Sequence, residues 1–192
     1  MVADPIFLGQ IRAKILASGA RVDSCILSTK AMCMIARGLG LRARPLTVET
    51  TIVNPVFATW IRARPLGTPI PDDVAYRLGD EGGRFVVVGD RTEPAKPGFW
   101  SGHLVAIVDS PYVTAPPRLI DLSIDQAHRP KKRINLTGPI TFPVEHTEFL
   151  QGTAEAHYNL DDLLIVYVAH PNDNSYSDSP DWLRTDDVTV SF

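Results

Sequence analysis

The N-terminal apolar residues recur at the three- and four-residue spacing of a helix face. They are Phe7, Leu8, Ile11 and Ile15. Residues at this spacing are neighbours on a helix, so they form one apolar stripe. Asp4 followed by Pro5 is typical of a helix N-terminus, and Gly19 is typical of a helix end. The pattern predicts a first helix from Asp4 to about Gly19.

Residues 24–37 are apolar nearly all the way round a helix, which predicts a second helix that is buried on most sides. Its apolar positions are Ile26, Leu27, Ala31, Met32, Cys33, Met34, Ile35 and Ala36. Asp23 or Ser24 is the expected N-terminal cap. Gly38 and Gly40 end the segment. A helix of this kind fits a central position against a sheet.

The rest of the chain is dominated by short β-branched and aliphatic runs bounded by turn residues, which predict strands. The runs are residues 44–51, 85–88, 103–108, 118–122, 140–144, 163–168 and a weak one near 154–158. Residues 54–64 predict a short helix that Asn54 and Pro55 begin. Helices followed by consecutive strands indicate an α+β fold with an antiparallel sheet.

We expect a single domain over residues 1–192, because 192 residues with 44% hydrophobic content suit one well-buried core. The polar stretch 65–83, rich in glycine and proline, is interpreted as an excursion or lid. The tail 171–192 is interpreted as mostly loop, with residues 179–182 opening a short turn of helix.

The charge pattern argues against nucleic acid as a partner. The net charge is −3, and the one basic cluster, residues 129–133, is interpreted as a solvated loop. No window approaches the ~20 apolar residues of a membrane span, so no membrane partner is expected. The N-terminal residues lack the pattern of a signal peptide, which makes a cytoplasmic location the expectation.

The two cysteines are expected to be free thiols. On one helix Cys25 and Cys33 would lie about 12 Å apart. A disulfide needs Cα atoms within about 7 Å. Free thiols are typical of a reducing compartment.

Cys25 is the strongest candidate for chemistry, because it is expected to begin the second helix. The helix N-terminus favours a thiolate, and the Cys25 N–H can donate to an oxyanion. His103 opens a predicted strand, and Asp121 lies near the end of the next. The order Cys25, His103, Asp121 indicates a thiol acyl-transfer site, with Asp121 orienting His103 as the base.

The segment from Cys25 to Gly40 resembles the nucleophile helix of the transglutaminase-like branch of the papain-like superfamily. In that family a cysteine helix ends in a leucine-glycine-aliphatic turn and leads into a strand. Residues 102–108 and 119–123 resemble the next two strands, which carry the histidine and the aspartate. The resemblance implies a papain-like or transglutaminase-like core, and arylamine N-acetyltransferases share that core. Leu104, Leu122 and Ser24 depart from the family pattern, which leaves the substrate and the reaction subtype open.

Other polar and aromatic residues receive lesser roles. Cys33, between Met32 and Met34, is interpreted as a core residue. Asp125 is the alternative carboxylate should Asp121 not serve. Trp100 is expected to line the substrate cleft beside His103. The remaining histidines lack metal-ligand spacing, so neither a metal nor another cofactor is expected.

The expected function is thiol-dependent acyl transfer on an amide or isopeptide bond, with hydrolysis of a peptide or protein substrate as the first choice. Deamidation and transamidation remain open. One alternative is a binding module with the same fold and no turnover. The other is an N-acetyltransferase-like enzyme that uses acetyl-CoA.

Overall fold

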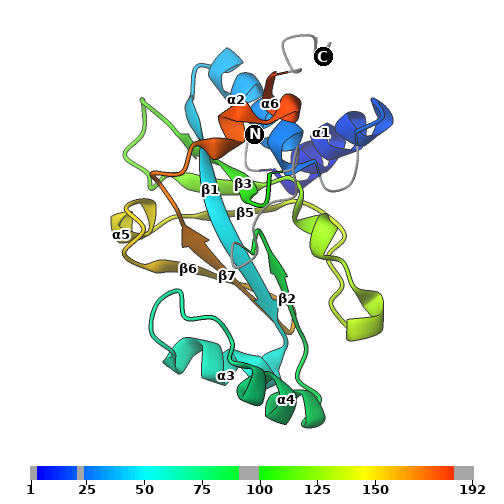
Figure 1. Ribbon diagram of the computed structural model, residues 1–192. Helices are drawn as coiled ribbons and strands as arrows, with labels where there is room; N and C mark the ends of the chain where they lie inside the picture. The colour runs from blue at the N-terminus through cyan, green and yellow to red at the C-terminus, as the bar shows by residue number, and fades with distance from the viewer. Residues whose placement is uncertain (1–3, 21–23, 91–99, 184–192) are drawn as a thin grey trace.

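A long strand, β1 (Arg42–Val53), organises the sheet in the computed structural model, which describes residues 4–20, 24–90 and 100–183 (Figure 1). The first part of β1 pairs with β3 (His103–Asp109), and its last part pairs along the same edge with β2 (Phe85–Val88). Its opposite edge pairs with β7 (Leu163–Ala169). Every pairing is antiparallel. β2 and β3 therefore follow one another along one edge of β1.

The sheet continues outward through β4 (Arg118–Asp121), β5 (Ile140–Pro143) and β6 (Glu155–Leu160), in the order β5-β4-β3-β1-β7-β6. The two outermost strands approach each other across the core. Phe142 of β5 stacks on Tyr158 of β6, with ring centroids 5.1 Å apart. The sheet is thus curled and nearly closed around its largest apolar cluster, which includes Val105, Leu119 and Ile165.

Two N-terminal helices cover the opposite face of the sheet, as the sequence predicted. They are α1 (Pro5–Ala17), capped by the Asp4 side chain, and α2 (Cys25–Gly38). Their buried residues pack with Ala106, Val108 and Ile120 of β3 and β4. Burial of α2 on most sides follows from its nearly continuous apolar surface.

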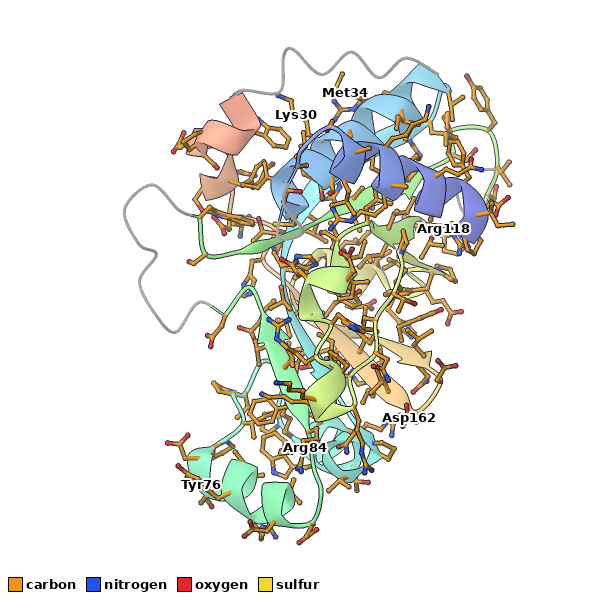
Figure 2. The ribbon with its side chains drawn as sticks, turned by 90° about the vertical axis from the view of Figure 1, so that its right-hand side faces the viewer. Lys30, Met34, Tyr76, Arg84, Arg118 and Asp162 are labelled. Carbon is orange, nitrogen blue, oxygen red and sulfur yellow. The ribbon has the colours of Figure 1, made fainter. Side chains whose placement is uncertain are left out.

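The far end of the molecule holds α3 (Pro55–Ala63) and α4 (Asp72–Asp80), which lie at the bottom of Figure 1. Residues 65–83 were interpreted from their sequence as a polar excursion or lid, and α4 was not predicted. Val74 and Leu78, one helical turn apart, give α4 a narrow apolar stripe that packs with Phe57. The opposite side of α4 is polar and open, and Figure 2 shows its exposed Tyr76 at the periphery.

The remaining described elements are short: η1 (Ile124–Ala127), η2 (Pro130–Lys132), α5 (Thr147–Leu150), η3 (Ser175–Asp178) and α6 (Pro180–Leu183). The basic residues 129–133 are exposed, as expected for a solvated loop. None of the helices in the described part of the chain is long and apolar enough to cross a membrane. The α+β class with an antiparallel sheet is confirmed.

Candidate active site

Cys25 is the first residue of α2, where the sequence placed it. The carbonyl of Ser24 accepts the N–H of Ser28 at 3.0 Å, which begins the helical hydrogen-bond pattern. The Cys25 N–H lies in the first turn, where backbone N–H groups have no partner within the helix. Its thiol is 5% exposed, with Sγ 3.9 Å from the carbonyl oxygen of Gly102. Cys25 and Cys33 are both free thiols, as predicted.

His103 and Asp121 lie on paired antiparallel strands, β3 and β4, which the sequence also predicted. His103 Nε2 is 2.7 Å from Asp121 Oδ2, and both side chains are 0% exposed. A carboxylate removed from water requires hydrogen-bond donors, and the imidazole N–H is one of them. Asp121 thereby fixes the orientation of the ring.

Each carboxylate oxygen of Asp121 accepts a further hydrogen bond from outside the His103 ring. Asp121 Oδ1 accepts the backbone N–H of Ser123 at 3.0 Å, and Oδ2 accepts the hydroxyl of Tyr167 at 3.2 Å. Burial and the neighbouring Asp121 carboxylate raise the pKa of Tyr167 well above its usual range, so its hydroxyl remains a donor. Three strands and a turn therefore hold this one carboxylate in place.

The pKa of His103 reflects opposing influences. Complete burial lowers the pKa, because a charged ring loses its hydration. The Asp121 carboxylate acts in the opposite direction through its charge and its hydrogen bond, and a hydrogen bond with Cys25 adds to it. The net effect raises the pKa of His103 from 6.5 to about 10. The arrangement therefore stabilises an imidazolium beside the Cys25 sulfur.

Gln126 completes the surroundings of the imidazole. Its Nε2 lies 2.7 Å from His103 Nδ1, on the side of the ring opposite the Asp121 contact. Gln126 comes from η1, the turn that follows β4, and its side chain is half-buried. Both ring nitrogens of His103 consequently have a side-chain partner.

The backbone of His103 is fixed at the junction of β2 and β3. Gly89, just after β2, has φ +76° and lies so close that a Cβ there would be 2.6 Å from the His103 nitrogen. A side chain at Gly89 would be strained by its backbone conformation and would collide with His103. β2 ends at Val88 and β3 begins at His103, and the close approach of Gly89 to His103 places the start of β3 beside the end of β2.

Trp100, predicted from the sequence to line a cleft beside His103, packs against the apolar cluster that contains Cys25. Its ring packs against Gly102 and belongs to an apolar cluster with Cys25, Leu104 and Tyr176. The indole Nε1–H donates to Ser175 Oγ at 2.9 Å. The cluster ties the segment that contains η3 to the N-terminal end of α2.

The C-terminal segment is held on α2 by a second set of contacts. Tyr176 and Trp182 meet edge to face, with ring centroids 4.8 Å apart. Lys30 of α2 donates to the carbonyl of Trp182 at 2.7 Å and lies over its indole ring. Figure 2 shows Lys30 between α2 and this segment. Aromatic side chains therefore form one wall beside Cys25.

Asp125, the alternative carboxylate, does not contact His103 through any described hydrogen bond. Its carboxylate pairs with Arg12 of α1, at 2.8 Å, and Arg12 also donates to Ser28 Oγ. Asp125 thus links η1 to the two N-terminal helices. The described residues contain no group of three or more His, Cys, Asp or Glu side chains that could hold a metal ion.

Neither Gln126 nor Tyr167 was predicted from the sequence to belong to the site. Tyr167 has a usable signal, since a tyrosine within the apolar run 163–168 needs a partner for its hydroxyl. Gln126 has none, because its neighbours in sequence are typical of any polar turn. In comparisons of the chain, no family model, no curated protein and no solved structure matches.

Proposed function

We propose that this protein is a thiol-dependent acyl-transfer enzyme that acts on an amide or isopeptide bond, with Cys25 as nucleophile, His103 as base and Asp121 as its orienting carboxylate. The observation that carries the proposal is the buried 2.7 Å contact between His103 Nε2 and Asp121 Oδ2, with the Cys25 thiol near enough to this ring to contribute to its raised pKa. Nucleophile, base and orienting group at this spacing are the requirements of covalent catalysis.

The mechanism begins with a proton transfer from Cys25 Sγ to His103 Nδ1, since Asp121 occupies Nε2. The thiolate then forms a bond to the substrate carbonyl carbon, and the carbonyl π electrons move to oxygen. The protonated Nδ1 next gives its proton to the leaving nitrogen as the C–N bond breaks. Water or an amine resolves the acyl-enzyme with His103 as base. Hydrolysis or transamidation follows from which nucleophile arrives.

The N-terminus of α2 supplies the electrostatic part of this mechanism. The Cys25 N–H has no partner within the helix and can donate to the oxyanion. The positive end of the helix dipole favours the thiolate and the oxyanion alike. The first turn of α2 contains no acidic residue. A carboxylate there would oppose the negative charges of the thiolate and the oxyanion.

We infer a papain-like or transglutaminase-like core from the same features. A buried helix begins with the nucleophile and packs on an antiparallel sheet whose adjacent strands carry the histidine and the aspartate. The order of these three residues along the chain supports that assignment. A peptide or protein segment is the proposed substrate, with Trp100 and Tyr176 as the apolar wall that receives it.

A binding module with the same fold is the second candidate, and the burial of the site favours it. His103 and Asp121 are 0% exposed and Cys25 is 5% exposed, so turnover requires the aromatic wall to open. A binding module requires no such opening. The two candidates differ in whether an acyl group ever reaches Cys25.

Trapping of an acyl-enzyme decides between them. We expect p-nitrophenyl acetate to add one acetyl group to Cys25, detected by peptide mass after an acid quench. The Cys25→Ala variant should not be acetylated, whereas the Cys33→Ser variant should react normally. Acetylation by acetyl-CoA as well would favour the acetyltransferase alternative. Absence of any acyl group on Cys25, in protein whose native fold is verified by circular dichroism, would contradict the enzyme and favour the binding module.

A further inference from the structure

Gln126 lies against the nitrogen through which His103 exchanges a proton in the proposed mechanism. Gln126 Nε2 is 2.7 Å from His103 Nδ1, and Asp121 Oδ2 is 2.7 Å from His103 Nε2. With Nε2 bonded to Asp121, Nδ1 is the nitrogen left for the Cys25 proton. His103 Nδ1 is therefore both the nitrogen that Gln126 contacts and the nitrogen to which Cys25 transfers its proton in the proposed mechanism.

The turn that carries Gln126 is anchored from several directions. Ile124 and Ala127 are 0% exposed and pin the turn to the core. Asp125 pairs with Arg12, at 2.8 Å. The carbonyl of Gln126 accepts a hydrogen bond from Arg129 at 2.8 Å. The side chain of Gln126 consequently extends toward His103 from a fixed backbone.

An amide nitrogen donates hydrogen bonds and does not accept them. In the observed contact His103 Nδ1 must accept, so the contact belongs to the neutral form of the ring, whose single proton lies on Nε2 and is shared with Asp121. A proton on Nδ1 would face the N–H groups of Gln126 and find no acceptor there. The protonated ring and the observed position of the Gln126 amide exclude one another.

We propose that Gln126 is a positioning residue that donates to His103 Nδ1 in the neutral form of the ring and must turn or withdraw its amide whenever Cys25 transfers a proton to that nitrogen. The proposal rests on the proposed function. While the Gln126 amide donates to Nδ1, that nitrogen cannot pass a proton to a leaving amine. Withdrawal of the amide therefore frees Nδ1 for both proton transfers of the proposed mechanism.

The charged and titratable groups around the ring agree with this assignment. Asp121 of β4 is hydrogen-bonded to the imidazole, Cys25 of α2 contributes to its raised pKa, and Tyr167 of β7 donates to Asp121. Arg12 of α1 neutralises Asp125 next to Gln126. Asp121 and Cys25 raise the pKa of His103 to about 10, against the lowering by burial, so the ring readily takes a proton once Gln126 leaves Nδ1.

The test compares Gln126→Met with the wild type in the pH dependence of Cys25 alkylation by iodoacetamide, read by peptide mass on the full chain. Methionine has a similar length but no N–H, so the neutral ring loses its stabilising donor. Gln151→Met, at an exposed position after α5, is the matched control. His103→Ala in the same assay tests the proposed function separately.

We expect the midpoint of the Gln126→Met profile to fall by about 0.3–1 pH unit, a two- to tenfold gain in rate on the rising limb, as loss of one hydrogen bond implies. The plateau rate at high pH should stay unchanged, and Gln151→Met should match the wild type. A higher plateau with an unchanged midpoint would mean that Gln126 only shields Cys25 from iodoacetamide, and that result would overturn the inference. An unchanged Gln126→Met profile would also overturn it, even if His103→Ala slows labelling. If His103→Ala leaves labelling unaffected, the proposed function fails, and this inference fails with it.

Discussion

Cys25 and Cys33 lie on the same helix, and their side chains are buried to nearly the same extent, 5% and 3% exposed. Their surroundings differ. Cys33 is enclosed by apolar residues of α1, α2 and the sheet, among them Leu8, Met32 and Ala106. Cys25, at the start of the helix, lies near enough to His103 to contribute to the raised pKa of its ring, and Cys25 Sγ is 3.9 Å from the carbonyl oxygen of Gly102.

The difference shows that burial alone does not determine what a thiol can do. Burial raises the pKa of Cys33 from 9.0 to about 11, and the nearby Arg37 guanidinium lowers it only in part. The thiol of Cys33 therefore stays protonated over the physiological range. Cys25 instead lies at a helix N-terminus and near an imidazole with a raised pKa, and both surroundings favour a thiolate. Position along the helix separates a core residue from a candidate nucleophile.

The most severe way to break this comparison is to remove His103. We expect His103→Ala to slow alkylation of Cys25 at about pH 6.5 by on the order of 10²-fold, because the base that takes the thiol proton is gone. Labelling of Cys33 should not change. Iodoacetamide labelling followed by peptide mass measures both rates in one sample. Equal slowing of both thiols would instead indicate a general change in the fold.

A milder change is Asp121→Asn, which keeps the volume and removes the charge that holds the ring. Labelling of Cys25 should fall about tenfold, since the amide no longer stabilises the imidazolium. Asp109→Asn, at the solvent-exposed ion pair with Arg42, is the matched control and should leave labelling unchanged. An Asp121→Asn protein that labels at the wild-type rate would show that Asp121 serves stability alone.

Serine substitutions compare the contributions of the two cysteines to the free energy of unfolding. Cys33→Ser places a hydroxyl among apolar side chains and should lower the free energy of unfolding by about 1–3 kcal/mol. Cys25→Ser should cost less than about 1 kcal/mol, because the hydroxyl can donate to the Gly102 carbonyl that Sγ already approaches. Urea unfolding of the two variants measures both values. A larger loss for Cys25→Ser would reverse the assignment of the core thiol.

The smallest expected effect is the order in which the two regions respond to alkaline pH. The pKa of His103 is raised from 6.5 to about 10, so its contribution to stability is complete below pH 6.5 and is lost as pH rises toward 10. The pKa of Cys33 is raised from 9.0 to about 11, so its contribution is lost only between those values. As pH is raised, the urea midpoint of the wild type should begin to fall before pH 9 is reached. The urea midpoint of His103→Ala should not fall in that range. Parallel curves for the two proteins would contradict the assignment of the first decline to His103.

Much of the fold could be predicted from local patterns. The helix start at Asp4 and Pro5, the all-round apolar surface of α2 and the β-branched strand runs all correspond to observed elements. The helix α4 was missed because its apolar stripe consists of Val74 and Leu78 alone. The full length of β1 was also missed, since it depends on pairing with β2, β3 and β7 and not on its own sequence.

The candidate site was predictable to a lesser degree. Cys25 begins α2, His103 begins β3 and Asp121 ends β4, so the local sequence could place each of them at the end of an element. Gln126 and Tyr167 are defined by partners 23 and 46 positions away, and no local pattern reports such contacts. The sequence made Asp125 the alternative carboxylate because it lies close to Asp121. In the structure Asp125 instead accepts hydrogen bonds from Arg12, 113 positions away. Long-range partners, which determine the protonation of His103, require the structure.

The central claim is that Cys25, and not Cys33, is poised as a nucleophile, and one measurement tests it most directly. Folded wild-type protein is treated with limiting iodoacetamide at about pH 6.5, and alkylation of each cysteine is followed by peptide mass. The account predicts that Cys25 reacts at least about tenfold faster than Cys33, since only Cys25 has a helix N-terminus and an imidazole to stabilise its thiolate. Equal and slow alkylation of both thiols, unchanged in His103→Ala, would contradict the account and leave the binding module as the better explanation.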